Sequence, residues 1–183
     1  MEIKLNYKSL WPGNEAPEQV NVIIEISACS TPVKYEMDKD SSLLHVDRFL
    51  NTAMHYPCNY GYVPGTKSPD GDAVDVLVVT PFPLQPACVI TVRPVGVLEM
   101  SDEKGKDRKI LAVPTEGLVD IYDHIKDYND LPTNLLKKIE HFFVHYKDLD
   151  VGKWSKVESW FGLDEAKKEI MDGIKAFQTT ETI

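Results

Sequence analysis

The chain has 183 residues, with 20 Lys or Arg against 29 Asp or Glu, so its formal net charge at pH 7 is −9. Its hydrophobic fraction of 43% and charged fraction of 27% are ordinary for a soluble globular protein and exclude a disordered tail, a collagen-like rod or a long coiled coil. The acidic excess argues against a broad nucleic-acid-binding face, because phosphate binding needs clustered positive charge, and it weakens attachment to anionic membranes. We therefore expect no nucleic-acid partner and no membrane partner.

The first part of the chain has the alternating pattern of short β-strands. Residues 1–18 are polar and interrupted by Pro and Gly, which predicts an N-terminal arm on the surface or a short entry helix. Strands are then predicted at residues 20–26, 33–37, 44–50, 74–80, 88–98 and 109–113. Four side chains of the first strand are predicted to share one face: Val20, Val22, Ile24 and Ile26. Residues 56–62, which are rich in Tyr, are interpreted as a loop whose rings mostly belong to the core.

After about residue 115 the pattern becomes helical. Apolar residues between Leu135 and Leu149 recur every three or four positions, behind Pro132 and Thr133, which predicts an amphipathic helix. A second helix is predicted to begin at Asp164 as its N-cap. Strands first and helices later indicate an α+β fold, with a closed barrel against which helices pack. We expect one domain over residues 1–183, mostly β over 18–115 and mostly helical over 116–177.

The cysteines and the N-terminal segment bear on the compartment. Cys29, Cys58 and Cys88 form no paired motif and are interpreted as reduced thiols of a reducing compartment. The N-terminal segment lacks the apolar core of a secretory signal, and no run approaches the roughly 18 apolar residues of a membrane span. We therefore expect a cytoplasmic protein.

The most informative segment is an acidic loop that leads into an apolar strand. Asp70 and Asp72 flank Gly71, and Asp75 follows inside the strand. Like charges so close together repel one another, and the arrangement is reasonable if a hard divalent cation lies among the carboxylate oxygens. An ordinary Asp/Gly turn would explain Asp70 and Asp72 alone. Asp75 favours the metal site, because a carboxylate within an apolar strand needs a partner.

Further charged residues would belong to the predicted metal site only if the fold brings them close to this loop. The segment 101–109 contains Asp102, Asp107 and Lys109. Taken alone, its pattern is typical of the solvated tip of a hairpin. Lys34 and Glu36 share a strand face, which is most simply the wet side of an edge strand. Arg48 is less easily explained in this way, since Arg is rarely buried without a partner.

Several segments together resemble the soluble family I inorganic pyrophosphatases. The acidic loop from Asp70 to Asp75 is similar to the D-x-D-x-x-D signature of that family, and the resemblance covers roughly residues 18–160. Its other motifs follow in the same order: Lys34-Tyr35-Glu36, Asp47-Arg48-Phe49, Tyr56-Pro57-Cys58-Asn59-Tyr60-Gly61, Arg93-Pro94-Val95-Gly96, residues 102–109 and His145-Tyr146-Lys147. The length resembles that of bacterial members. One departure is Ala73, where the family usually has Pro or Glu, and we expect it to alter loop stiffness without loss of activity.

The resemblance implies a five-stranded closed OB-like barrel with flanking C-terminal helices, and Mg²⁺-dependent hydrolysis of pyrophosphate to two orthophosphates. It implies several Mg²⁺ ions in each site, for which Mn²⁺ or Zn²⁺ could substitute, and a homohexamer. Asp72 would be the general base for a metal-activated water, and Glu25 would orient the site from behind. The metal ligands would be Asp70, Asp75, Asp102, Asp107 and Glu36. The substrate-binding residues would be Lys34, Arg48, Tyr60, Lys109, Tyr146 and Lys147.

Two other functions remain open at the level of the sequence. One is a non-catalytic OB-like module that binds an oligonucleotide or oligosaccharide on Tyr56, Tyr60 and Tyr62. The acidic net charge argues against an oligonucleotide as its ligand. The other is a metal-dependent phosphohydrolase that acts on nucleotides or polyphosphate. Phosphate release from pyrophosphate, with ATP and tripolyphosphate in the same assay, separates these alternatives.

Overall fold

The computed structural model describes residues 11–38 and 41–181, so the part of the expected N-terminal arm at residues 1–10 lies outside the described residues. The strands are β1 (Val20–Ile26), β2 (Val33–Met37), β3 (Leu44–Phe49), β4 (Asn59–Val63), β5 (Val74–Val78), β6 (Val89–Asp102), β7 (Gly105–Pro114) and β8 (Ser155–Phe161). The α-helices are α1 (Thr133–His145) and α2 (Leu163–Glu181), and short 3₁₀ helices lie at Asp120–Tyr122 and Tyr128–Asp130.

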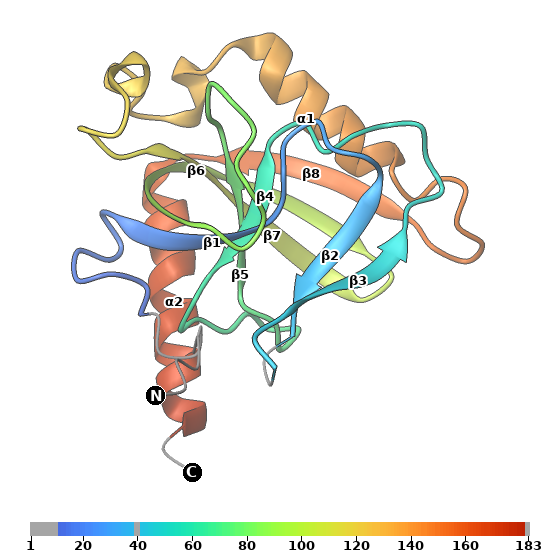
Figure 1. Cartoon of the computed structure of the whole chain (residues 1–183), viewed down its shortest axis with the longest axis horizontal. Helices are drawn as coiled ribbons and strands as arrows, with labels where there is room; N and C mark the ends of the chain where they lie inside the picture. The colour runs from blue at the N-terminus through green and yellow to red at the C-terminus, as the bar shows by residue number, and fades with distance from the viewer. Residues whose placement is uncertain (1–10, 39–40, 182–183) are drawn as a thin grey trace.

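The main sheet closes on itself into a barrel. Its strand order is β1-β4-β5-β7-β6-β8, and an additional pairing of β1 with β6 joins the first five of these strands into a ring (Figure 1). The long strand β6 makes this closure possible, because it pairs through Val89–Val92 with β1 and through Val97–Asp102 with β8. The predicted α+β fold with a closed barrel of five strands is therefore confirmed.

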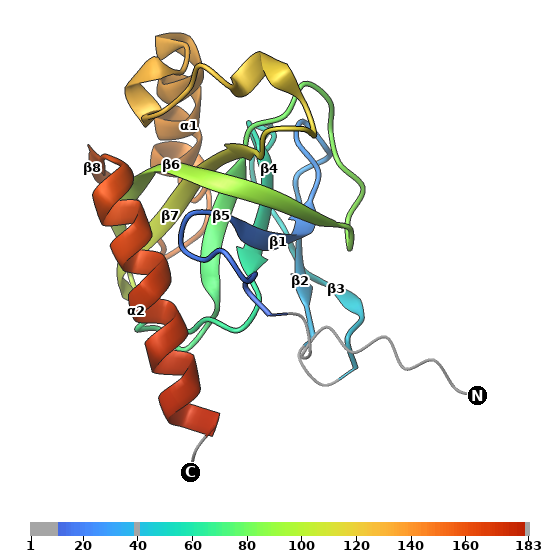
Figure 2. The ribbon, with the colours of Figure 1, turned by 90° about the vertical axis from the view of Figure 1, so that its left-hand side faces the viewer.

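A separate two-stranded sheet of β2 and β3 projects from the barrel (Figure 1). Figure 2 shows α2 along one side of the barrel and β2 with β3 on the other. The strand β2 follows β1 after a short turn, in which the amide of Cys29 donates to the carbonyl of Tyr56 at 2.9 Å.

The core consists of two clusters that take alternate residues of the same strands. Val76 of β5 and Ile110 of β7 belong to the cluster that includes α2, whereas Leu77 and Leu111 belong to the cluster that includes α1. The predicted sharing of one face by the four residues of β1 is wrong for Ile26, which packs in the α1 cluster. The pairing of β1 with β4 is irregular between Ile24 and Ile26, and this irregularity turns Ile26 to the other face.

The helical part differs from the sequence prediction at three places. The helix α1 ends at His145, so Tyr146 and Lys147 follow it rather than continuing it toward Leu149. The helix α2 begins at Leu163, which places Asp164 within the first turn and not at the N-cap. The strand β8 lies between the helices, in a region for which only helices are predicted, and pairs with β6.

The strand β4 lies where the sequence predicts a loop, and Gly61 explains how this strand fits the barrel. A Cβ atom at this position would lie 2.0 Å from the carbonyl oxygen of Ile23, so only glycine lets β1 and β4 approach so closely.

Within the described residues, no helix is long and apolar enough to cross a membrane.

Candidate active site

One cavity of about 680 Å³ gathers all the site residues predicted from the sequence. Its lining comes from the strands β1 to β7, from the acidic loop before β5, from the end of α1 and from the segment before β8. The predicted residues along its wall are Glu25, Lys34, Glu36, Arg48, Tyr60, Asp70, Asp72, Asp75, Asp102, Asp107, Lys109, Tyr146 and Lys147. The fold thus brings positive and negative side chains from distant parts of the sequence into a common space.

The floor of the cavity is an ion-paired group on the neighbouring strands β5 and β7. The register of this parallel pair sets Asp75 opposite Lys109. The Lys109 Nζ lies 2.5 Å from Asp75 Oδ2 and 2.9 Å from Asp107 Oδ1. Burial lowers the pKa of Lys109, but the charges of Asp75, Tyr60 and Asp107 outweigh it and raise that pKa well above its ordinary value. Lys109 therefore remains charged and holds the two carboxylates near each other.

A second ion-paired group joins the β6–β7 hairpin to the end of α1. The Lys147 Nζ donates to Asp102 Oδ2 at 2.7 Å and to the two Glu103 oxygens at 3.0 and 3.2 Å. Burial raises the pKa of Asp102, whereas the hydrogen bonds from Lys147 and the Lys104 amide lower it, and the net direction is down. The Asp102 carboxylate is therefore ionised at neutral pH, as a metal ligand must be.

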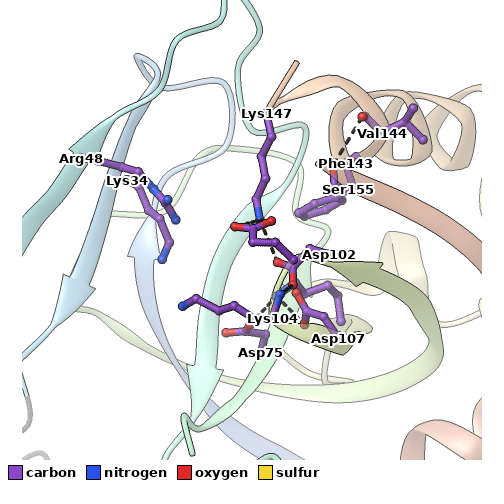
Figure 3. Close-up of polar contacts among 12 residues, drawn as sticks. Lys34, Arg48, Asp75, Asp102, Lys104, Asp107, Phe143, Val144, Lys147 and Ser155 are labelled. Carbon is purple, nitrogen blue, oxygen red and sulfur yellow. Dashed lines mark hydrogen bonds and ion pairs between the residues drawn. The ribbon is translucent and has the colours of Figure 1, made fainter. Parts of the chain in front are cut away.

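The β2–β3 sheet supplies the opposite wall. Lys34 and Arg48 are register partners on these strands, and Lys34 forms ion pairs with Glu36 and with Asp47, the latter at 3.5 Å. Figure 3 shows Lys34 and Arg48 on one side of the site, facing Asp75, Asp102 and Lys147 on the other. An anion with several charged oxygens can therefore contact cations on both walls.

Glu25 supports this wall from within the barrel. It is 7% exposed, and its Oε1 accepts a hydrogen bond from the Met37 amide at 2.7 Å. Met37 ends β2, the strand that carries Lys34 and Glu36, so Glu25 fixes the position of that strand relative to β1. Burial raises the pKa of Glu25 to about 8.

Two buried phenols border the same space. The Tyr60 hydroxyl accepts a hydrogen bond from Lys109 Nζ at 3.1 Å, and burial raises its pKa. Burial also raises the pKa of Tyr146, which is 8% exposed and stacks on Phe142. Both phenols stay protonated at neutral pH and can donate to a phosphate oxygen.

The acidic loop forms the exposed rim next to Asp75. Gly71 has a φ of +95°, a conformation that favours glycine, and the Asp72 amide donates to Asp70 Oδ1 at 3.1 Å. The Ser68 amide donates to the Asp72 carbonyl at 2.6 Å, which closes the turn. Asp70 and Asp72 are therefore held at the mouth of the cavity with their side chains exposed to solvent.

The residues of the cavity suit a hard divalent cation in their chemistry, because they offer several carboxylate oxygens and no cysteine thiol. Across residues 11–38 and 41–181, no three His, Cys, Asp or Glu side chains form a ready-made cage for one ion. The ammonium groups of Lys109 and Lys147 lie among the carboxylates instead. A bound ion would compete with these lysines for the same carboxylates.

The cavity also contains residues that the sequence did not single out. Glu103 pairs with Lys147, and its only signal is its position beside Asp102 in the hairpin turn. His45 and Lys153 line the cavity from β3 and from the segment before β8. No local pattern distinguishes either of them from an ordinary surface residue.

Comparisons with known proteins agree with this architecture. Residues 22–178 match the protein family described as inorganic pyrophosphatase. An inorganic pyrophosphatase of Salmonella typhimurium is 60% identical over 159 residues, which are 87% of this chain and 90% of that protein. The crystal structure of an inorganic phosphatase from Anaplasma phagocytophilum has a TM-score of 0.91 at 51% identity, covering 93% of this chain and 99% of that one. The inorganic pyrophosphatase structure from Thermus thermophilus has a TM-score of 0.89 at 41% identity, covering 94% and 99%.

Proposed function

The chain belongs to the inorganic pyrophosphatase family, and we propose that its cavity hydrolyses pyrophosphate to two orthophosphates with bound Mg²⁺ and with Asp72 as the general base. It is an inorganic diphosphatase, a hydrolase of phosphoanhydride bonds. Enzymes of this family depend on metal ions.

One observation carries the proposal: cations and carboxylates face each other across the same cavity. Pyrophosphate is a compact anion that needs positive charge around its oxygens, whereas Mg²⁺ needs oxygen ligands. Mg²⁺ bound here would lower the pKa of the attacking water and neutralise charge on the substrate. We assign its ligands to Asp70, Asp75, Asp102, Asp107 and Glu36, with Mn²⁺ or Zn²⁺ as substitutes.

Asp72 suits the role of general base because it is exposed at the cavity mouth. It stands two residues after Asp70, in a turn whose backbone is fixed by hydrogen bonds from the Ser68 and Asp72 amides. A general base needs a position next to the attacking water and freedom to pass the proton on to solvent. Asp75, by contrast, is engaged with Lys109 and is better suited to hold an ion.

The cationic side chains suit the leaving phosphate. We assign Lys34 and Arg48 to one phosphate and Lys147, with its chain neighbour Tyr146, to the other, because Lys147 lies across the site from Lys34 and Arg48. Lys109 and Tyr60 would contact the substrate from the floor of the cavity. These donors stabilise the negative charge that develops as the bridging bond breaks.

The substrate assignment is tested by measuring phosphate release at equal concentrations of pyrophosphate, tripolyphosphate and ATP with Mg²⁺. We expect pyrophosphate to be hydrolysed with the highest kcat/KM by more than about tenfold. A preference for ATP or tripolyphosphate would instead support a nucleotide or polyphosphate hydrolase. Absence of release from all three would support the OB-like binding module.

We also propose one domain over residues 1–183, a homohexamer and a cytoplasmic location. The resemblance to bacterial members supports the hexamer, and so do large exposed apolar side chains such as Phe49 and Phe82, at 75% and 76% exposure, which subunit contacts would cover. Three free cysteines suit a reducing compartment. Sedimentation velocity tests the hexamer, and a monomer at micromolar concentration would contradict it.

A further inference from the structure

An arginine of β7 lies between two residues of the site but faces away from it. Side chains alternate along a strand, so Asp107 and Lys109 point toward the cavity and Arg108 points toward α2. Ile110, two residues further, packs in the core cluster of α2, which is consistent with this orientation. The contacts of Arg108 therefore lie on the side of β7 that faces away from the cavity, behind Asp107 and Lys109.

The Arg108 guanidinium is engaged on all sides. Its Nε donates to Glu99 Oε2 at 2.8 Å, and its Nη2 lies 2.6 Å from the same oxygen. Its Nη1 lies 3.0 Å from Glu169 and 3.5 Å from Glu165, which are one turn apart on α2. The Arg108 Cζ also lies 5.6 Å from the centre of the Phe161 ring. The side chain is only 19% exposed, so this is a partly desolvated and oriented network rather than a loose surface pair.

The network adjoins the proposed metal ligands directly. A smaller cavity of about 220 Å³ is lined by Arg108 and Glu169 together with Asp70, Asp75 and Asp107. Without the arginine, the glutamates of β6 and α2 would lack their shared counter-charge and would repel one another beside these aspartates. The strand segment that carries Asp107 would then lose its ionic link to α2.

We propose that Arg108 is a positioning residue, which ties β7 to α2 and thereby sets the position of the Asp107 carboxylate for binding a divalent cation. The inference rests on the proposed function, in which Asp107 is a metal ligand. Arg108 itself contacts neither the ion nor the substrate. It acts as an outer support, and loss of such a support typically weakens metal binding about 10–100-fold.

The test is direct Mn²⁺ binding, measured by electron paramagnetic resonance of the free ion on metal-depleted full-length chain without substrate. We expect Arg108→Met to weaken Mn²⁺ binding at least about tenfold, and Arg108→Lys to weaken it less, because lysine keeps the charge but not the fork of donors. The matched control is Lys106→Met, which removes another cation paired with Glu99 but one that is 61% exposed. It should change binding by less than about twofold.

Thermal unfolding of each variant separates positioning from a purely structural role. A folded Arg108→Met chain that binds Mn²⁺ like the wild type, even with a lower Tm, would overturn the inference. If Arg108→Met does not fold, Arg108→Lys and Glu169→Gln are measured in its place. Wild-type Mn²⁺ affinity in both of these variants would overturn the inference. Asp107→Asn tests the underlying assignment. If Asp107→Asn binds Mn²⁺ normally, both the metal role of Asp107 and the inference are wrong. If Asp107→Asn weakens Mn²⁺ binding but the Arg108 variants do not, only the inference is wrong.

Discussion

The Lys109 Nζ lies 2.5 Å from Asp75 Oδ2, and the two residues are register partners of the parallel strands β7 and β5. The same ammonium lies 2.9 Å from Asp107 Oδ1. Sheet register alone therefore places a cation between two carboxylates at the floor of the cavity. In the chain without metal, this lysine supplies the positive charge that keeps the aspartates together.

Replacement of this lysine should make the fold depend on metal. In Lys109→Met, the two carboxylates lose their counter-charge, so we expect the free energy of unfolding in chelator to fall by about 3 kcal/mol. Added Mg²⁺ should restore part of the loss, because it binds the folded chain. Urea unfolding with and without Mg²⁺ measures both effects. An equal loss in both buffers would contradict the idea that lysine and metal serve the same carboxylates.

Replacement of Asp72 should separate turnover from metal binding. Asp72→Asn keeps the size of the side chain and the backbone contacts of the turn, but it removes the proton acceptor. We expect kcat to fall by about 10²–10⁴-fold, the usual contribution of a general base. Mn²⁺ affinity and Tm should change little. Near-normal turnover would remove Asp72 from this role.

Glu25 should make the stability of the chain depend on pH. Burial raises its pKa from 4.5 to about 8, so the folded state binds this proton more tightly than the unfolded state does. The resulting stability is fully present below about pH 4.5 and is lost as the pH rises through about 8. Glu25→Gln cannot ionise and should lack this loss.

The measurement is urea unfolding of the wild type and Glu25→Gln in chelator, at pH values from about 5 to about 9. As the pH rises over this range, the free energy of unfolding of the wild type should fall by about 3–5 kcal/mol relative to that of Glu25→Gln. A pH-independent difference would show that Glu25 ionises in the folded state as readily as in the unfolded one.

A fold prediction concerns the close approach of β1 and β4. In Gly61→Ala, the added methyl group would meet the Ile23 carbonyl, so we expect a loss of about 3 kcal/mol or more in the free energy of unfolding. Gly117→Ala is the matched control, because no atom lies within 4 Å of its added Cβ and only its φ of +91° opposes the change. It should cost about 1 kcal/mol. Equal losses would contradict the close packing of the barrel at Gly61.

Local patterns predict most of the fold, and its misses have physical causes. The alternation of β1 and β2 gives their bounds correctly. The strand β4 escapes notice because Gly61, a residue that weakens strands in general, is required there by the approach of β1. The strand β8 has no fully buried residue and no regular alternation of apolar and polar side chains, and its pairing with β6 makes it a strand. Such tertiary pairing cannot be read from a local pattern.

The site shows the same division between local and tertiary information. The aspartates of the acidic loop stand out because carboxylates at the start of an apolar strand are unusual. Lys147 does not stand out, since a lysine at a helix end is common, and only the fold reveals its contact with Asp102 across 45 residues of sequence. Arg108 is invisible for a related reason, because its partners lie on β6 and α2.

The most direct test of the account is phosphate release from pyrophosphate by the metal-depleted chain as Mg²⁺ is added back. We expect no release above background in chelator, and full turnover once Mg²⁺ saturates the carboxylates of the cavity. Release that continues undiminished in excess chelator would contradict it.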